Sequence, residues 1–342
     1  MACKTLELVA KKYNTIKVTF HGGEPTLVGK KYYEDLFAYE KELKKKYDVS
    51  FHHIFQTNGF LLDEKFIDML ISEKTLISIS FDGLHNDILR SSTEEVYKVI
   101  ELVQSKNGRL RVFCVETAKS ILNLKETYEW FKSKNINYKI LPIQPRGFAE
   151  NQNELILNID TYVNKLLELY EYWIFDKESN ITLYTFEEFI RLREDNSFKE
   201  IWFDRKLSLN ADGKLYPFGR PHDINFCLGD PMLIEDIEDC FISDNYKELK
   251  NTLNEMIVKQ CKNCKAYNVC GGNCLCSSFV YGNDQEMLDY ACKLAEKTFL
   301  SVIEINKKVE QDIENGYLDK YSSKVIKYFY KEEIGSCACM NK

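Results

Sequence analysis

The fold class of this chain is indicated by residues 16–26, Ile16-Lys-Val-Thr-Phe-His-Gly-Gly-Glu-Pro-Thr26. Its β-branched and aromatic residues predict a strand over Ile16–Phe20. The Gly-Gly-Glu-Pro string that follows predicts a tight turn out of that strand. The next residues, Lys30–Tyr47, are charged and amphipathic with a helical period. A strand, a turn and a helix in this order form one repeating unit of an α/β fold.

The same alternation continues through the first 150 residues. Four further runs of apolar, β-branched and aromatic residues predict strands at Phe51–Gln56, Leu76–Phe81, Leu110–Val115 and Tyr138–Leu141. Further amphipathic stretches predict helices at Asp63–Glu73, Thr93–Lys106 and Asn123–Lys134, with Asp63 and Thr93 as N-caps, and a leading helix at Cys3–Tyr13. Five strands separated by four helices predict a parallel α/β sheet or a partial barrel, whose ligands bind at the carboxyl ends of the strands.

Composition limits the class of protein and its partners. The 342 residues are 44% hydrophobic and 29% charged, which excludes a disordered or fibrous protein. The net charge of −7 argues against a large nucleic-acid-binding surface. No apolar run approaches the roughly 18–20 residues that span a bilayer, and the N-terminus lacks the apolar segment of a signal peptide. We therefore expect a cytoplasmic protein with neither nucleic acid nor membrane as a partner.

A second module is predicted after residue 200. Residues 158–203 are helical in pattern and rich in aromatic residues, and they connect the two modules. Beyond them, Asn210-Ala-Asp-Gly213 predicts a hairpin, Asn245–Leu253 a helix and Gln285–Lys331 a long helical tail. The predicted domains are therefore residues 1–200, an α/β module with a helical connection, and residues 201–342, a cysteine-rich module with C-terminal helices.

The ends of the first three predicted strands carry polar motifs. Gly22 and Gly23 allow a ligand to approach the backbone closely, and Glu24 adds a carboxylate, which together suit a positively charged amine. Gln56-Thr-Asn-Gly59 and Ser80-Phe-Asp-Gly83 place short polar side chains at the same edge, suited to ribose or carboxylate oxygens. Each of these strings alone is also a common turn. The recurrence at successive strand ends favours ligand binding.

The histidines are scattered and are interpreted as solvated or core residues.

The twelve cysteines are concentrated near the C-terminus, where ten follow residue 226. Clustered thiols in a reducing compartment more often bind metal than form disulfides. The series Cys261-x2-Cys264-x5-Cys270-x3-Cys274, with Cys292 beyond it, can supply four thiolates to zinc or to a [4Fe–4S] cluster. Spacing alone does not decide between these two metals.

In their order and spacing, the GGEPT, QTNG and SFDG motifs resemble the radical S-adenosylmethionine (SAM) enzymes, in the branch that matures sulfatases and ribosomal peptides. The resemblance implies that Gly23 and Glu24 hold the methionyl amine of SAM. It further implies that Ser80, Arg90 and Leu141 contact the cofactor. The fold it implies is a partial (β/α)6 TIM-like barrel, here without its first strand, followed by a SPASM-type iron–sulfur domain and a helical tail.

One departure from the family is large. Its members cleave SAM with a cluster held by a CxxxCxxC string after the first strand, and no such string occurs in this sequence. We therefore expect an N-terminally truncated form, inactive alone, or a relative that has lost catalysis.

The resemblance also covers the cysteine series. In the SPASM domain one auxiliary cluster takes the cysteines that match Cys261, Cys264, Cys270 and Cys292, and that set is complete here. A second cluster would use Cys274, with Cys227, Cys240 and Cys276 as candidate substitutes for the missing ligands. The default interpretation of each of these three is a buried free thiol. Phe218 stands where the family places another cysteine ligand, and Gly219 where sulfatase maturases carry an aspartate base, which counts against sulfatase maturation.

The function that this implies is a radical SAM/SPASM maturase that oxidatively modifies, for example cross-links, a ribosomally made peptide or protein. It would require SAM, a [4Fe–4S] cluster and a reductant. The alternative is a non-catalytic iron–sulfur or zinc binding module that acts as a partner of a complete enzyme.

Overall fold

The computed structural model describes residues 1–145, 149, 151–192, 205–217, 224–272 and 285–329. The chain divides into two compact units that interleave along the sequence. The first comprises Met1–Cys114, Glu200–Lys262 and Gly272–Leu288, and the second comprises Val115–Lys199, Asn263–Gly271 and Asp289–Lys342. The domain boundary predicted near residue 200 divides the chain by sequence pattern, whereas these two units are defined by compactness. That boundary stays a prediction.

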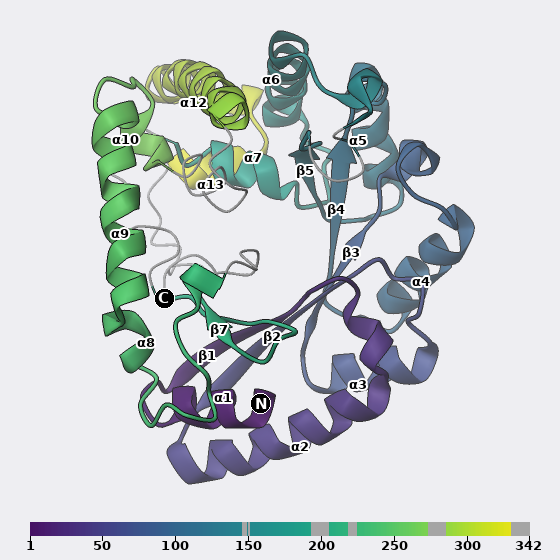
Figure 1. Ribbon diagram of the computed structural model, residues 1–342. Helices are drawn as coiled ribbons and strands as arrows, with labels where there is room; N and C mark the ends of the chain where they lie inside the picture. Colours follow the sequence, from purple (N-terminus) through teal and green to yellow (C-terminus); the bar gives the residue numbers. More distant parts are fainter. Residues whose placement is uncertain (146–148, 150, 193–204, 218–223, 273–284, 330–342) are drawn as a thin grey trace. The chain divides into compact units, whose positions relative to one another are not determined.

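All five predicted strands are present (Figure 1), and the ends of each lie within one residue of the predicted bounds. They are β1 (Thr15–Phe20), β2 (Ser50–Thr57), β3 (Leu76–Ser80), β4 (Leu110–Glu116) and β5 (Tyr138–Pro142). Their order in the sheet follows the chain, β1-β2-β3-β4-β5. The pairs β1/β2, β2/β3 and β3/β4 are parallel, with Ile16 opposite Phe51 and Gln56 opposite Ser78. The predicted fold class, an α/β partial barrel, is confirmed.

The helices of the first unit follow the predicted alternation. They are α1 (Ala2–Ala10), α2 (Lys30–Tyr47), α3 (Glu64–Ser72) and α4 (Thr93–Ser105), with short 3₁₀ turns η1 (Pro25–Val28) and η2 (Gly83–Ile88) after β1 and β3. Asp63 caps α3 as predicted, since its carboxylate accepts a hydrogen bond from the Phe66 N–H at 2.7 Å. The predicted cap at Thr93 is wrong. Ser92 occupies the N-cap position of α4, and the Thr93 hydroxyl is hydrogen-bonded to Asp87 instead.

Alternate residues of β2 are buried against α2. Phe51, His53, Phe55 and Thr57 are buried, whereas the residues between them are half-buried or exposed. His53 is thus a core histidine, and its Nε2 lies 2.7 Å from a carboxylate oxygen of Glu40 on α2, with both side chains 1% exposed. This pair joins the middle of β2 to the helix that covers it.

Helix α1 packs on two sides within the first unit. Leu6 and Ala10 share a core with Ile16 of β1 and with α2, and Leu8 belongs to a second core. That second core is formed with the hairpin β6 (Ser208–Leu209) and β7 (Leu215–Tyr216), with α8 (Asp239–Ile242) and with α9 (Asp244–Met256). The predicted hairpin at Asn210–Gly213 and the helix over Asn245–Leu253 are therefore present, the helix being longer than predicted.

The second unit is mainly helical in its described residues. Besides strand β5, its described elements are η3 (Ile121–Asn123), α5 (Leu124–Ser133), η5 (Asn153–Leu155), α6 (Ile159–Phe175), α7 (Tyr184–Phe189), α10 (Tyr267–Cys270), most of α12 (Gln285–Glu314), η8 (Leu318–Lys320) and α13 (Ser323–Phe329). Asn306 of α12 accepts a hydrogen bond from the Tyr170 hydroxyl at 2.6 Å and donates to the Phe189 carbonyl at 2.9 Å, so it ties three helices together. The predicted tail is helical but broken at Gly316, whose φ of +85° ends the long helix.

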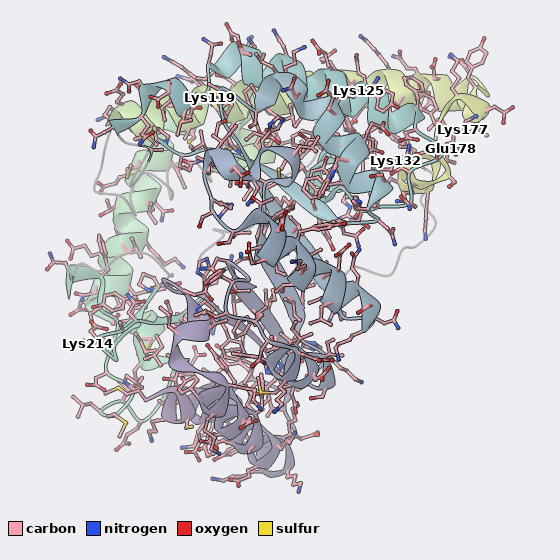
Figure 2. The ribbon with its side chains drawn as sticks, turned by 90° about the vertical axis from the view of Figure 1, so that its right-hand side faces the viewer. Lys119, Lys125, Lys132, Lys177, Glu178 and Lys214 are labelled. Carbon is pink, nitrogen blue, oxygen red and sulfur yellow. The ribbon has the colours of Figure 1, made fainter. Side chains whose placement is uncertain are left out.

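Charged side chains on the surface of the second unit include lysines that contact nearby carboxylates and aromatic rings. Figure 2 labels Lys119, Lys125, Lys132 and Lys177 on this surface, with Glu178 beside the last. Lys132 forms an ion pair with Asp176 at 2.7 Å, and the Lys125 ammonium lies 3.8 Å from the ring centroid of Tyr172. Within the described ranges, no helix combines the length and the apolar character that crossing a bilayer requires.

Candidate functional site at the strand ends

The turn after β1 exposes its backbone. Gly22 has φ of +129°, a conformation that side chains rarely adopt, and it is exposed together with Gly23. A Cβ placed on either glycine would meet no atom within 4 Å, so both face open space. The turn is anchored on its other side, because the buried Tyr33 hydroxyl donates to the Pro25 carbonyl at 2.7 Å. Burial raises the pKa of Tyr33 well above its usual value, which keeps this donor protonated.

The Glu24 carboxylate is held by donors from two strand ends. Its Oε1 accepts from the Thr26 N–H at 3.1 Å, from the Thr26 hydroxyl at 2.7 Å and from the Thr57 hydroxyl at 2.7 Å. Its Oε2 accepts from the Asn58 N–H at 2.8 Å. The GGEPT and QTNG motifs, predicted to lie at one edge of the sheet, are therefore brought together through this one side chain.

Gln56 makes the equivalent connection to the third motif. Its side-chain amide donates to the Ser80 hydroxyl oxygen at 3.1 Å. A hydroxyl that accepts one bond still carries its own proton, which Ser80 can donate to a ligand oxygen. The structure thus joins β3 to the same strand-end assembly.

Arg90 is oriented by its own loop. Its Nε donates to Asp82 at 2.8 Å and a terminal nitrogen reaches the other oxygen of the same carboxylate at 3.4 Å. Asp82 is buried, and its backbone N–H donates to the Asn86 side chain at 3.0 Å. Because a guanidinium has five N–H donors, this fork leaves donors of Arg90 for a second anionic group.

Two further residues at strand ends, Leu141 and Glu116, lie in the second unit. Leu141, the remaining residue that the resemblance implies, is half-buried in β5. Glu116, at the end of β4, is a buried carboxylate that accepts from the Ser120 hydroxyl at 2.6 Å. Sequence reasoning missed Glu116, because a single acidic residue after a strand carries no signal that separates a buried network from a solvated surface.

The predicted cluster cysteines are placed only in part. Cys261 is the last residue of the π-helix η7 (Ile257–Cys261) in the first unit, whereas Cys264, Cys270 and Cys292 belong to the second. Burial raises the pKa of the Cys264 thiol, and nearby Glu296 and Cys270 raise it further, partly offset by backbone N–H groups. Among the described residues, no three His, Cys, Asp or Glu side chains are gathered closely enough to hold a metal ion. The donor type nevertheless fits iron, since thiolates are the usual ligands of iron–sulfur clusters.

The remaining cysteines and the C-terminal motif positions are described only in part. Cys274, Cys276, Phe218 and Gly219 lie outside the described residues. Cys240 is a member of the apolar core beneath the hairpin, where burial raises its pKa to about 11. The half-buried Cys227 lies 3.8 Å from the Gly229 carbonyl oxygen. A role for either thiol in a second cluster stays a prediction.

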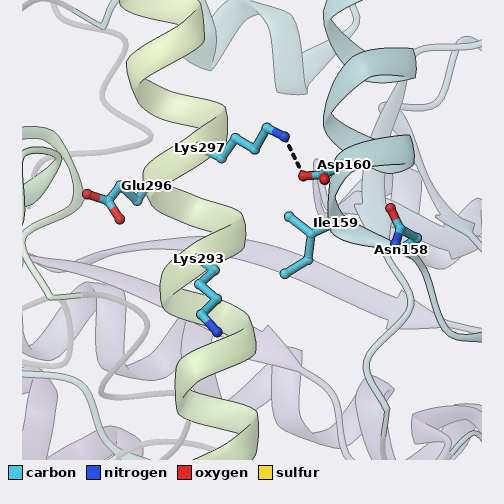
Figure 3. A pocket seen from close by; sticks show the side chains of 6 residues that line it. All are labelled: Asn158, Ile159, Asp160, Lys293, Glu296 and Lys297. Atoms are coloured by element: carbon cyan, nitrogen blue, oxygen red, sulfur yellow. Dashed lines mark hydrogen bonds and ion pairs between the residues drawn. The ribbon is translucent and has the colours of Figure 1, made fainter.

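A separate pocket in the second unit lies between the start of α6 and α12 (Figure 3). It is lined by Asn158, Ile159, Asp160, Lys293, Glu296 and Lys297. Asp160 and Lys297 form an ion pair across it, and Asn158 is used as the N-cap of α6, accepting from the Thr161 N–H at 3.0 Å. The Asp160–Lys297 pair thus links the two helices, and Asn158 caps α6. We assign the candidate site to the strand ends.

Comparison with known proteins gives three related findings. Residues 4–131 match the model of the Radical SAM superfamily. The "Cysteine-type anaerobic sulfatase-maturating enzyme" of Clostridium perfringens is 25% identical over 275 residues, which cover 75% of this chain and 72% of that enzyme. The "Radical SAM cyclopropyl synthase TigE" of Paramaledivibacter caminithermalis is 24% identical over 335 residues, or 90% of this chain and 64% of that protein.

A solved structure supports the same fold. Native anSMEcpe with bound AdoMet and the Cp18Cys peptide superimposes with a TM-score of 0.69 at 19% identity, and 90% of each chain is covered. At this identity the likeness shows the fold. Together with the family match, it confirms the predicted resemblance to radical SAM enzymes of the maturase branch.

Proposed function

We propose that this chain, whose residues 4–131 match the Radical SAM superfamily, binds SAM at the strand-end site and acts in the modification of a ribosomally made peptide. The observation that carries the proposal is the Glu24 carboxylate, held by four hydrogen bonds beside the exposed backbone of Gly22 and Gly23. A fixed carboxylate next to an open glycine backbone suits an amine ligand.

The other predicted contacts fit the remaining parts of this cofactor. Ser80 offers a hydroxyl proton, which suits a ribose oxygen, and Arg90 offers a guanidinium already oriented by Asp82, which suits the methionyl carboxylate. Leu141 would add an apolar contact, as the family resemblance implies. Once reduced by an iron–sulfur cluster, SAM supplies radical chemistry of the kind that abstracts hydrogen from a peptide.

The named relatives support the peptide as substrate class. One is a sulfatase-maturating enzyme, and the similar solved structure holds a cysteine-containing peptide. We propose an oxidative modification such as a cross-link, and a [4Fe–4S] cluster on Cys261, Cys264, Cys270 and Cys292.

Binding of SAM is the measurement that tests this proposal, because it does not depend on turnover. Calorimetry should detect SAM binding to the wild-type chain under anaerobic conditions. Glu24→Ala removes a charge-assisted contact and should weaken binding by about 1–3 kcal/mol, or roughly 5- to 150-fold. The matched control is Glu73→Ala, which removes a carboxylate at the C-cap of α3 that pairs with Lys41 at 2.6 Å, and this variant should bind like wild type. Absence of wild-type binding, or equal binding by the Glu24 variant, would contradict the proposal.

The alternative is a non-catalytic iron–sulfur or zinc binding module. The observation that favours it is the lack of a CxxxCxxC string in this sequence. It predicts cluster or zinc loading without SAM binding, so the same calorimetric experiment separates the two functions.

A further inference from the structure

The Thr57 hydroxyl is oriented by the loop that follows it. Thr57 is 2% exposed, and its Oγ1 accepts a hydrogen bond from the Gly59 N–H at 3.0 Å. An oxygen that accepts there directs its own proton elsewhere, and the Glu24 carboxylate oxygen lies 2.7 Å away. The hydroxyl therefore acts as a donor to Glu24 in a fixed direction.

The rest of the QTNG motif fixes this loop. The Asn58 side-chain oxygen accepts a hydrogen bond from the Phe60 N–H at 2.9 Å, which closes a turn. In this turn the backbone N–H of Asn58 points at the Glu24 carboxylate. Gly59 has φ of +82°, and a Cβ there would lie 3.2 Å from Ile79 and 3.3 Å from Val96. Both the backbone conformation and the available space therefore require glycine at this position. The resulting turn directs the Thr57 hydroxyl and the Asn58 N–H at the Glu24 carboxylate.

We infer that Thr57 is a positioning residue, which acts on the amine of SAM through Glu24 and does not itself contact the cofactor. The sequence predicts that the QTNG motif supplies polar groups to the ligand. In the structure, the Thr57 hydroxyl and the Asn58 N–H are already used by Glu24. The inference rests on the proposed binding of SAM at this edge of the sheet.

The test is a double-mutant cycle in SAM binding, measured by calorimetry on the full chain. Thr57→Val keeps the shape of the side chain and removes the donor, and it should weaken binding roughly 3- to 10-fold. Thr57→Ser restores the hydroxyl and should recover most of the lost affinity. In the Glu24→Ala background, Thr57→Val should have no further effect, because residues that act through one another are not additive.

The control is a second buried threonine. Thr75 is 1% exposed, and its hydroxyl has no hydrogen-bond partner among the described residues, so Thr75→Val should leave SAM binding unchanged. Thermal unfolding of each variant identifies any loss caused by misfolding. Wild-type affinity in a folded Thr57→Val variant, or a full additional loss in the Glu24→Ala background, would overturn the inference. Absence of binding by the wild type would instead overturn the proposed function.

Discussion

The predicted functional residues form two groups, one at the strand ends and one in the cysteine segment (residues 261–292). The two groups are organised differently. At the strand ends, Glu24, Ser80 and Arg90 are each held by a neighbouring protein group at hydrogen-bond distance. After residue 260 the candidate ligands are thiols, which hydrogen-bond weakly and must lose a proton to bind metal. Burial raises the pKa of Cys264 and so favours the form that does not bind.

The difference separates two ways of building a site. The side chains at the strand ends are already oriented by hydrogen bonds within the protein. Ligand binding therefore loses little side-chain conformational entropy. A thiol site gains its order from the metal, because binding and deprotonation occur together. We therefore expect the strand-end site to tolerate loss of metal, and the cysteine segment to depend on it.

The largest expected effect is on iron content. In the proposed cluster, Cys264→Ala removes one of four ligands and should lower iron and sulfide from about four of each per chain to near zero after anaerobic reconstitution, with loss of the absorbance near 400 nm. Cys3→Ala, which changes an exposed cysteine of α1, is the control and should retain the metal. SAM binding should survive in both variants if the two sites are independent. Zinc without iron in the wild-type chain would contradict the cluster assignment.

Much of the fold could be predicted from the sequence because period and length are local properties. The strand at residues 50–57 alternates buried and exposed positions along its length, and Lys30–Tyr47 carries one apolar stripe, so each pattern indicates a single element. The N-cap of α4 is not the predicted residue: both Ser92 and Thr93 are cap-type residues, and the Thr93 hydroxyl bonds to Asp87 in the preceding turn η2 instead of capping the helix.

The site could be predicted only as a set of motifs. That Glu24 and the QTNG motif lie at one edge followed from the parallel sheet, but their direct bond depends on the register of β1 against β2. The pairing of His53 with Glu40 has the same origin, since one residue comes from a strand and its partner from the preceding helix. Neither pairing leaves a periodic trace in the sequence.

An intermediate effect is expected on the stability of the contact between β2 and α2, which supports the strand-end site. Glu40→Ala removes the acceptor of the buried His53 ring and leaves a cavity beside it, which should cost about 3–5 kcal/mol of unfolding free energy. Glu40→Gln keeps an acceptor oxygen and a similar volume, and should cost markedly less. Thermal unfolding followed by circular dichroism measures both. Equal loss in the two variants would mean that charge, and not the hydrogen bond, holds this pair.

The smallest expected effect concerns the pH dependence of Cys264 in the metal-free chain. Because burial raises its pKa, the thiol stays protonated to a higher pH than a free thiol, and less thiolate is present at any given pH below that value. Alkylation by iodoacetamide, followed by mass spectrometry of the Cys264 peptide, should therefore reach its half-maximal rate at a higher pH than N-acetylcysteine does. Reconstitution with iron and sulfide should protect the same peptide across the pH range. A midpoint at or below that of N-acetylcysteine would show that the fold itself prepares the thiolate, and the contrast between the two sites would then fail.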